Sequence, residues 1–146
     1  MRYITIETAP NEIMPHSIYS FLQMVEAKTW DDTKVVGTHS IMMATADPIQ
    51  NKRERPVSKT LIFPEYTDEY PHLKHTVGFG GRPGGPEFYI NLDDNRDHHG
   101  PGGQDHHDLA EEADPCFGKV VHGFEILPKL KDYNPIVIKS MKLVSN

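Results

Sequence analysis

The sequence contains a single cysteine, Cys116, among its 146 residues. One thiol cannot form an internal disulfide, and it leaves a structural zinc ion without a thiolate pair. There is also no run of about eighteen apolar residues, which a membrane-spanning helix requires. The opening MRYITIETAP lacks the apolar stretch of a secretion signal. We therefore expect a cytoplasmic protein that does not enter a membrane.

Basic side chains are scarce relative to acidic ones. There are 15 Lys and Arg residues against 21 Asp and Glu residues, which gives a formal net charge of −6. Binding to nucleic acid depends on clustered Lys and Arg side chains. The one short basic run, residues 52–55, is interrupted by Glu54 and precedes Pro56, so we interpret it as a solvated turn. We expect no nucleic-acid partner.

Apolar residues make up only 37% of the sequence, whereas there are twelve prolines and eleven glycines. This composition favours a turn-rich, strand-rich fold over a helical bundle. The length suits one core, so we predict a single domain over residues 1–146 and expect a monomer.

The hydrophobic pattern predicts short strands separated by turns, at 3–8, 35–45, 60–63, 76–79, 87–92, 117–121 and 135–144. A first helix is predicted after Pro15, from an apolar stripe at Ile18, Phe21, Leu22 and Val25. A second, short helix is predicted within 123–130, and residues 80–86 are predicted to be an exposed connection. Because no βαβ alternation is present, these elements favour a mainly β fold, a closed antiparallel barrel.

One stretch, NRDHHGPGGQDHHD at residues 95–108, holds four of the nine histidines. A tight Pro-Gly turn could bring its two Asp-His-His arms together. His98 or His99 with His106 or His107, and a carboxylate from Asp97, Asp105 or Asp108, would then suit zinc or nickel. The alternatives are a hydrogen-bonded rim, braced by His99 and Gln104, and a solvated loop. Spacing alone is unspecific, so we assign no metal site.

Five segments in order resemble the cyclophilin family: MPHSIYSFLQMV (14–25), YPHLKHT (70–76), GPEFYINL (85–92), FGKVVHGFEIL (117–127) and PIVIKSMKLV (135–144). The resemblance implies an eight-stranded barrel capped by two helices, with a groove for proline-containing peptides on its outer face. It also implies peptidyl-prolyl cis-trans isomerase activity, which requires no cofactor.

Carried over by position, Tyr89 falls on the aromatic floor of the family's proline pocket, on the strand face opposite Phe88 and Ile90. The wider set expected to bind substrate is Met42, Met43, Phe79, Glu87, Tyr89, His99 and Leu109. Since successive side chains of a strand alternate, Met42 and Met43 cannot both face the peptide, and one is expected in the core.

The family's catalytic arginine has no counterpart, because no arginine lies between Arg2 and Arg53. Asp114 replaces a family histidine, and Ala44 lies near the position of a glutamine. We expect His39 or Gln104 to act as the polar donor beside Tyr89. The alignment of residues 34–47 permits two registers, so the position of His39 is open to a shift.

Three functions follow from the resemblance and its departures. The first is a slow isomerase acting on Xaa-Pro peptide bonds, with His39, Tyr89 and Gln104 as its catalytic residues. The second is a non-catalytic module of the same fold that binds a proline-containing segment of a partner protein, which the missing arginine favours. The third is a metal-binding barrel built on the His-rich stretch.

Overall fold

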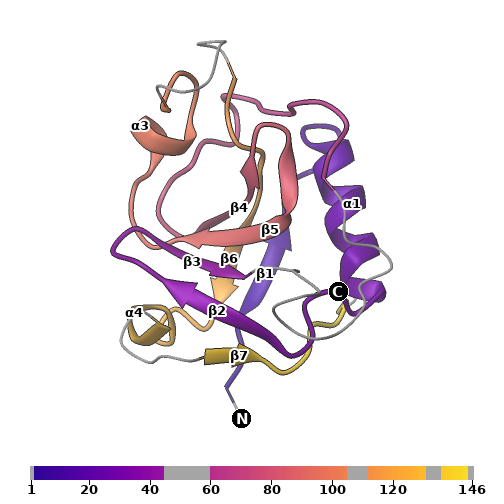
Figure 1. Ribbon diagram of the computed structural model, residues 1–146, viewed down its shortest axis with the longest axis vertical. Helices are drawn as coiled ribbons and strands as arrows, with labels where there is room; N and C mark the ends of the chain where they lie inside the picture. Colours follow the sequence, from indigo (N-terminus) through magenta and orange to yellow (C-terminus); the bar gives the residue numbers. More distant parts are fainter. Residues whose placement is uncertain (1, 45–59, 105–111, 131–135, 145–146) are drawn as a thin grey trace.

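The computed structural model describes residues 2–44, 60–104, 112–130 and 136–144. These residues form a curled antiparallel sheet of seven strands with α1 packed against its concave side (Figure 1). The strands are β1 (Thr5–Thr8), β2 (Thr33–Gly37), β3 (Ile41–Ala44), β4 (Thr76–Gly81), β5 (Gly84–Asn91), β6 (Cys116–His122) and β7 (Ile136–Ile138). The helices are α1 (Pro15–Glu26) and the single turns α3 (Arg96–His99) and α4 (Leu127–Leu130).

The order of strands in the sheet is β1-β6-β4-β5-β3-β2-β7. In this order β5 lies between β4 and β3, where Tyr89 is directly opposite Gly78 on one side and Met43 on the other. Residues directly opposite each other in an antiparallel pair project from the same face. Gly78, Tyr89 and Met43 therefore share one face of the sheet, the face opposite to Phe88.

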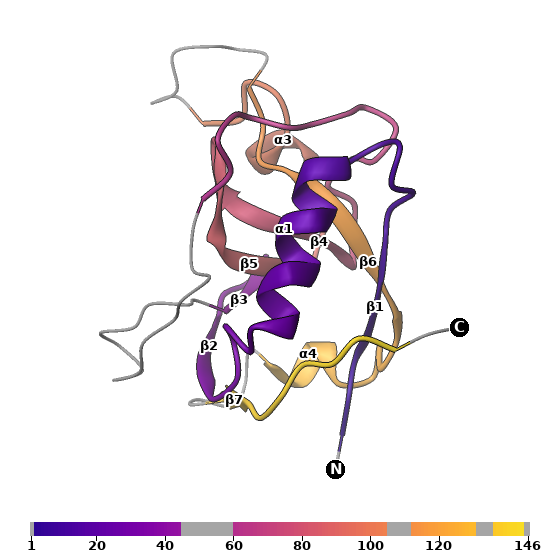
Figure 2. The same cartoon turned by 90° about the vertical axis from the view of Figure 1, so that its right-hand side faces the viewer.

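Helix α1 covers the core face of the sheet (Figure 2). Its apolar stripe is buried as predicted, with Ile18, Phe21 and Val25 no more than 4% exposed. The ring of Phe21 is the centre of an aromatic cluster, with ring centroids 4.8 to 6.2 Å from those of Trp30, Phe79, Phe88 and Phe117. Burial of large aromatic rings contributes much of the stability of such a core.

The N-terminus of α1 is capped from elsewhere in the chain. Met14 offers no side-chain hydrogen bond at the N-cap position. The carboxylate of Glu65 instead accepts hydrogen bonds from the backbone N–H groups of His16 and Ser17, at 3.1 and 2.7 Å. These bonds satisfy two of the donors that a helix leaves free at its start.

The mainly β, antiparallel fold predicted from the sequence is confirmed. The described residues nevertheless form seven strands in a curled sheet with β1 and β7 at its two edges, and not a closed ring of eight. The segment predicted as a strand at residues 60–63 is irregular, because it makes one backbone bond to the sheet, from Leu61 N–H to the Gly84 carbonyl, before it reaches α1.

Two other elements differ from their predictions. Of residues 80–86, predicted as an exposed connection, 80–81 end β4 and 84–86 begin β5 around a two-residue turn, and Gly84 and Gly85 are buried. Gly84 lies so close to Phe79 and Pro115 that a Cβ atom there would meet them at 2.6 and 2.9 Å. The described part of the closing segment is strand only over Ile136–Ile138, whereas the short second helix predicted within 123–130 is present as the single turn Leu127–Leu130.

The predicted strand at 35–45 is divided by a turn at residues 38–40. The hydroxyl of Thr38 accepts hydrogen bonds from the backbone N–H groups of Ser40 and Ile41, at 3.3 and 3.2 Å. His39 lies in this turn and not in a strand. None of the helices in the described residues is long and apolar enough to cross a bilayer.

Candidate functional site

The candidate site is the outer face of β5, where the resemblance places a peptide groove. The side chains of this strand alternate as predicted: Phe88 and Ile90 belong to the apolar core, whereas Tyr89 and Asn91 project to the other side. Both outward side chains are nevertheless completely buried, with exposures of 0%. Other parts of the chain therefore cover this face.

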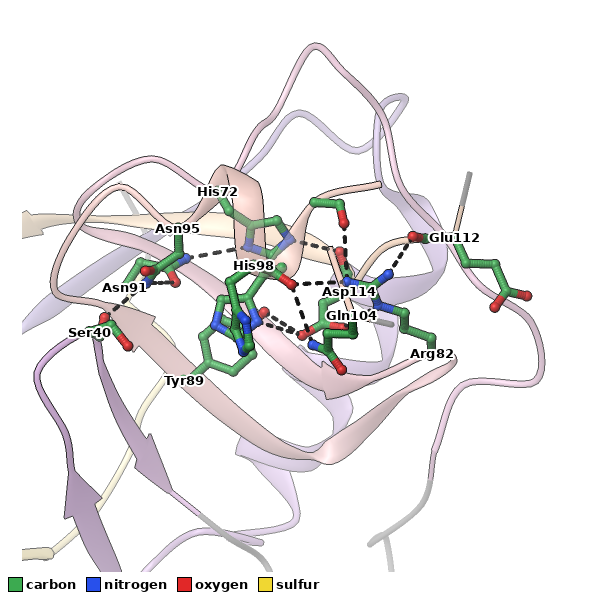
Figure 3. A network of polar contacts seen from close by, with 12 residues as sticks. Ser40, His72, Arg82, Tyr89, Asn91, Asn95, His98, Gln104, Glu112 and Asp114 are labelled. Carbon is green, nitrogen blue, oxygen red and sulfur yellow. Dashed lines mark hydrogen bonds and ion pairs between the residues drawn. The ribbon is translucent and has the colours of Figure 1, made fainter. Parts of the chain in front are cut away.

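The buried carboxylate of Asp114 is the central hydrogen-bond acceptor of the residues that cover this face (Figure 3). Its Oδ2 atom accepts hydrogen bonds from the Tyr89 hydroxyl at 2.9 Å and from Nδ1 of His99 at 3.1 Å. Its Oδ1 atom accepts one from Nε of Arg82 at 3.0 Å. The donors come from the β4–β5 hairpin with its strand β5, and from α3, so Asp114 connects the sheet to α3.

The pKa values of this cluster follow from burial and hydrogen bonding. Burial raises the pKa of Asp114, but the hydrogen bonds from His99, Tyr89 and Arg82 together lower it by more, so it lies below its usual value. Burial, followed by the charge of Asp114, raises the pKa of Tyr89 well above its usual value. At neutral pH the site therefore holds a carboxylate and a neutral phenol.

Arg82 supplies a guanidinium from the tip of the β4–β5 hairpin, and its side chain is 0% exposed. Besides Asp114, it donates to the backbone carbonyls of Glu112 at 2.6 Å, Gly100 at 3.1 Å and His98 at 3.3 Å. Because a guanidinium has only donors, these four acceptors account for most of its hydrogen-bonding capacity. Arg82 thus fixes the segment around α3 to the sheet.

His72 completes the cluster on the side of β4. Its Nε2 atom lies 2.9 Å from the backbone carbonyl of Asp114, which only accepts, so Nε2 carries the proton. Nδ1 then accepts from the Asn91 side-chain amide at 3.4 Å. Burial lowers the pKa of His72 to about 4, against the opposing effect of its hydrogen bond to Asp114. This imidazole is neutral at neutral pH.

Gly78 makes the close packing of this cluster possible. A Cβ atom at this position would lie 2.5 Å from the Pro115 carbonyl oxygen and 3.3 Å from both the His72 and the Tyr89 rings. Real Cβ atoms do not approach a carbonyl oxygen so closely, so any larger residue would push these groups apart. The absence of a side chain on β4 therefore lets the neighbouring rings cover the sheet.

The ring of His99 packs against the ring of Tyr89. The two rings are stacked, with centroids 4.6 Å apart and planes inclined by 28°. His99 itself is only 6% exposed. Its backbone is held as well, since His99 N–H bonds to the Asn95 carbonyl at 2.8 Å and Asp114 N–H bonds to the His99 carbonyl at 3.0 Å. His99 is therefore an integral part of the packed structure.

The residues predicted to bind substrate are divided among three environments. Phe79 lies in the core, with its ring 4.5 Å from that of Phe117, and Met42 is also a core residue at 4% exposure. Neither is placed to meet a peptide at the surface, because β-strand alternation turns both toward α1. Tyr89 and His99 lie together on the outer face, but each is buried by the other.

Met43 and Glu87 are the predicted residues that stay partly accessible on the outer face. Both border Gly80, where a Cβ atom would lie 3.9 Å from the Met43 methyl carbon and 3.8 Å from a Glu87 carboxylate oxygen. One of the two adjacent methionines was predicted to be in the core, which agrees with Met42 inside and Met43 outside. Leu109 lies outside the described residues.

The structure does not bring the two predicted donors together with Tyr89. His39 is exposed in the β2–β3 turn, where it borders a hollow of about 150 Å³ with Lys74, His75, Leu92, Leu127 and Pro128. Gln104 donates a long hydrogen bond to the His98 carbonyl, at 3.5 Å. Its catalytic role, like that of His39, stays a prediction.

The described residues contain no group of three or more His, Cys, Asp or Glu side chains placed to hold a metal ion. The second Asp-His-His arm, residues 105–108, lies outside the described ranges. The first arm ends in His99, whose Nδ1 is already bonded to Asp114. Residues 95–104 take the form of a rim braced against the sheet.

Sequence reasoning missed Arg82, His72 and Asn91 as parts of this site. Arg82 stood in a Gly-rich segment predicted to be exposed, and His72 in a turn. One signal was available: Asp114 replaces a family histidine, and a carboxylate at a buried position requires donors. The arginine that donates to Asp114 is Arg82, which precedes β5 in the chain.

Comparison with known proteins agrees with this architecture. No curated protein matches the chain by sequence. A crystal structure of a Cryptosporidium parvum cyclophilin type peptidyl-prolyl cis-trans isomerase, determined in the presence of the dipeptide Ala-Pro, is similar with a TM-score of 0.71 and 16% identity. That similarity covers 98% of this chain and 93% of the other.

Two further solved structures are similar at lower scores. The cyclophilin AquaCyp293 from Hirschia baltica gives a TM-score of 0.63 at 14% identity, covering 94% of this chain and 68% of that one. The Mimivirus cyclophilin gives 0.56 at 20% identity, covering 91% and 72%. At these identities the similarities show the fold.

The sequence itself identifies the family. Residues 3–143 match the family model described as cyclophilin type peptidyl-prolyl cis-trans isomerase/CLD. This match spans nearly the whole chain, and the curled sheet with α1 on its core face agrees with it. The chain therefore belongs to the cyclophilin-type peptidyl-prolyl cis-trans isomerase family.

Proposed function

We propose that this cyclophilin-family chain binds an extended, proline-containing segment of a partner protein without catalysing its isomerisation. The observation that carries this proposal is the burial of Tyr89, the residue at the position of the pocket floor, at 0% exposure beneath His99. A proline ring can pack on this aromatic floor only where the floor is open. Here another ring is stacked on it.

The chemistry of isomerisation supports the absence of catalysis. Rotation about an amide has a barrier of about 18–20 kcal/mol, and each ~1.4 kcal/mol of preferential binding to the twisted state gives a tenfold acceleration. Such binding needs a donor aimed at the twisting amide. The guanidinium of Arg82 lies nearby, but Asp114 and three backbone carbonyls already accept its hydrogen bonds.

The accessible remainder of the outer face gives the proposal a binding surface. Met43 and Glu87 are half-buried beside Gly80, at the edge of the covered region. A flexible thioether adapts to apolar side chains of different shapes, and a neighbouring carboxylate accepts backbone N–H groups of a bound segment. An extended chain can bind at this surface without contacting the buried Tyr89.

Exchange NMR on an Xaa-Pro peptide tests the proposal. With protein and peptide at comparable concentrations, we expect the cis-trans exchange rate to equal that of the free peptide. We also expect peptide-dependent shifts at Met43 and Glu87, which Met43→Ala should reduce and the distant Val121→Ala should leave unchanged. A clear acceleration of exchange by the wild-type chain would overturn the assignment.

A slow isomerase is the second candidate, and one observation favours it. The site does contain a buried guanidinium, that of Arg82, although it comes from the β4–β5 hairpin and not from the strand that the resemblance indicates. Catalysis by this group would require residues 98–100 to release it. The same exchange experiment distinguishes the two candidates, because only the isomerase shortens the exchange time of the peptide.

A further inference from the structure

The segment that covers Tyr89 resembles a proline-containing peptide in its ring and its backbone. We call residues 95–104 the His99 loop. Its imidazole, a five-membered ring, is stacked on Tyr89 with the centroids 4.6 Å apart and lies 5.6 Å from the ring of His72. The pyrrolidine of proline is also a five-membered ring, so the two rings would compete for one space.

The backbone of the same loop binds the guanidinium as a peptide would. Arg82 donates to the carbonyl of His98, the residue before the ring, and to that of Gly100, the residue after it. An Xaa-Pro segment likewise presents a carbonyl before its ring and another after it. The loop therefore offers the site a ring with flanking carbonyls in the order that an external substrate has.

We propose that the His99 loop is an internal ligand, which occupies the proline site and keeps the protein autoinhibited. This inference rests on the proposed function, since it gives the cause of the absent catalysis. A tethered ligand acts at an effective concentration in the millimolar range, so a short peptide of weaker affinity cannot displace it. Displacement of the loop uncovers Tyr89 and frees carbonyl-binding donors of Arg82.

The loop is held by contacts that can be loosened without altering the site. Gly103 lies against α3, and a Cβ atom there would meet the Asp97 carbonyl oxygen at 2.6 Å and the His98 carbonyl more closely still. The substitution Gly103→Ala must therefore shift the loop, while Tyr89, Arg82 and Asp114 keep their side chains. His99→Ala removes the competing ring directly.

The test is an NMR titration of the full chain with the dipeptide Ala-Pro, together with exchange NMR on an Xaa-Pro peptide. We expect His99→Ala and Gly103→Ala to bind Ala-Pro at least tenfold more tightly than the wild type, with shifts at Tyr89. Asp97→Ala is the matched control, because Asp97 is exposed in the same loop, and this variant should bind no better than the wild type.

The outcomes separate this inference from the proposed function. If the wild type does not accelerate exchange, and the two variants give the dispersed spectra of folded proteins but bind Ala-Pro no more tightly, the internal-ligand proposal is wrong and the proposed function stands. If His99→Ala does not fold, the affinity of Gly103→Ala for Ala-Pro decides the question, because this variant keeps the His99 ring. A wild type that already accelerates exchange overturns both.

Discussion

At the scale of single residues, the site depends on Asp114, whose two oxygens accept hydrogen bonds from Arg82, Tyr89 and His99. The carboxylate and the guanidinium are 2% and 0% exposed, so neither is solvated by water. A buried ion pair contributes little net stability compared with apolar residues, yet removal of one partner is costly. Among the residues of the site, we therefore expect substitution of Asp114 to lower the free energy of unfolding most.

We predict that Asp114→Asn destabilises the fold by about 3–5 kcal/mol, because it leaves the buried Arg82 guanidinium without its counter-charge. The new amide would also direct a donor at groups that are themselves donors. Denaturant unfolding measures the effect. Asp94→Asn is the matched control, since Asp94 forms an exposed ion pair with Arg96 and its loss should change the midpoint little. Equal effects of the two substitutions would contradict the role given to Asp114.

His72 predicts a dependence of stability on pH. Its pKa is about 4 in the folded protein against 6.5 for an ordinary histidine, because burial disfavours the charged form. As the pH falls below 6.5 the unfolded chain takes up a proton that the folded protein does not, so the free energy of unfolding decreases until about pH 4. The loss is about 3 kcal/mol, at 1.36 kcal/mol for each pKa unit.

The measurement is the free energy of unfolding at several pH values between 7 and 4 for the wild type and for His72→Gln. Glutamine retains a donor and an acceptor but does not titrate, so we expect a flatter profile. The exposed His39→Gln should keep the wild-type slope. Loss of stability from Asp114 belongs to more acidic conditions, because its pKa lies below 3.8 and its contribution disappears only as it is protonated. A wild-type slope in His72→Gln would contradict the assignment.

At the scale of elements, local sequence was enough where an element is stabilised by its own pattern. The apolar stripe after Pro15 predicted α1, and the alternation around Tyr89 predicted both faces of β5. It failed where distant groups decide the conformation. Residues 60–63 have the composition of a strand, but they lead directly to Glu65, which is hydrogen-bonded to the start of α1. Residues 84–86 belong to β5 and not to an exposed connection, because Gly84 packs on Phe79.

The capping of α1 by Glu65 gives a prediction at this scale. Glu65→Gln keeps a side-chain carbonyl but loses the charge that three donors at the start of the helix, including the Ser17 hydroxyl at 2.6 Å, now share. We expect a destabilisation of about 1 kcal/mol, the usual value of a helix cap. Thermal unfolding measures it. Glu69→Gln, an exposed residue on the same connection, should have no comparable effect; if it does, the cap is not the cause.

At the scale of the whole molecule, the family and the mainly β fold could be predicted from five short segments in the right order, and the family match and the similar structures agree with them. The burial of Tyr89 at the site could not be predicted from the sequence. His99 and Arg82 meet Asp114 across 15 and 32 residues of sequence, and no local pattern signals these bonds. The sequence placed Tyr89 on the outer face, but it did not predict that His99 would cover it.

The closure of the outer face over Tyr89 is the central claim, and the accessibility of that ring in solution tests it most directly. In photo-CIDNP NMR a dissolved dye polarises only those tyrosine and histidine rings that it can touch. We expect strong signals from Tyr3 and Tyr19, which are 65% and 68% exposed, and none from Tyr89 in the wild type. A polarised Tyr89 in the wild-type chain would show that the floor is open and would contradict the account.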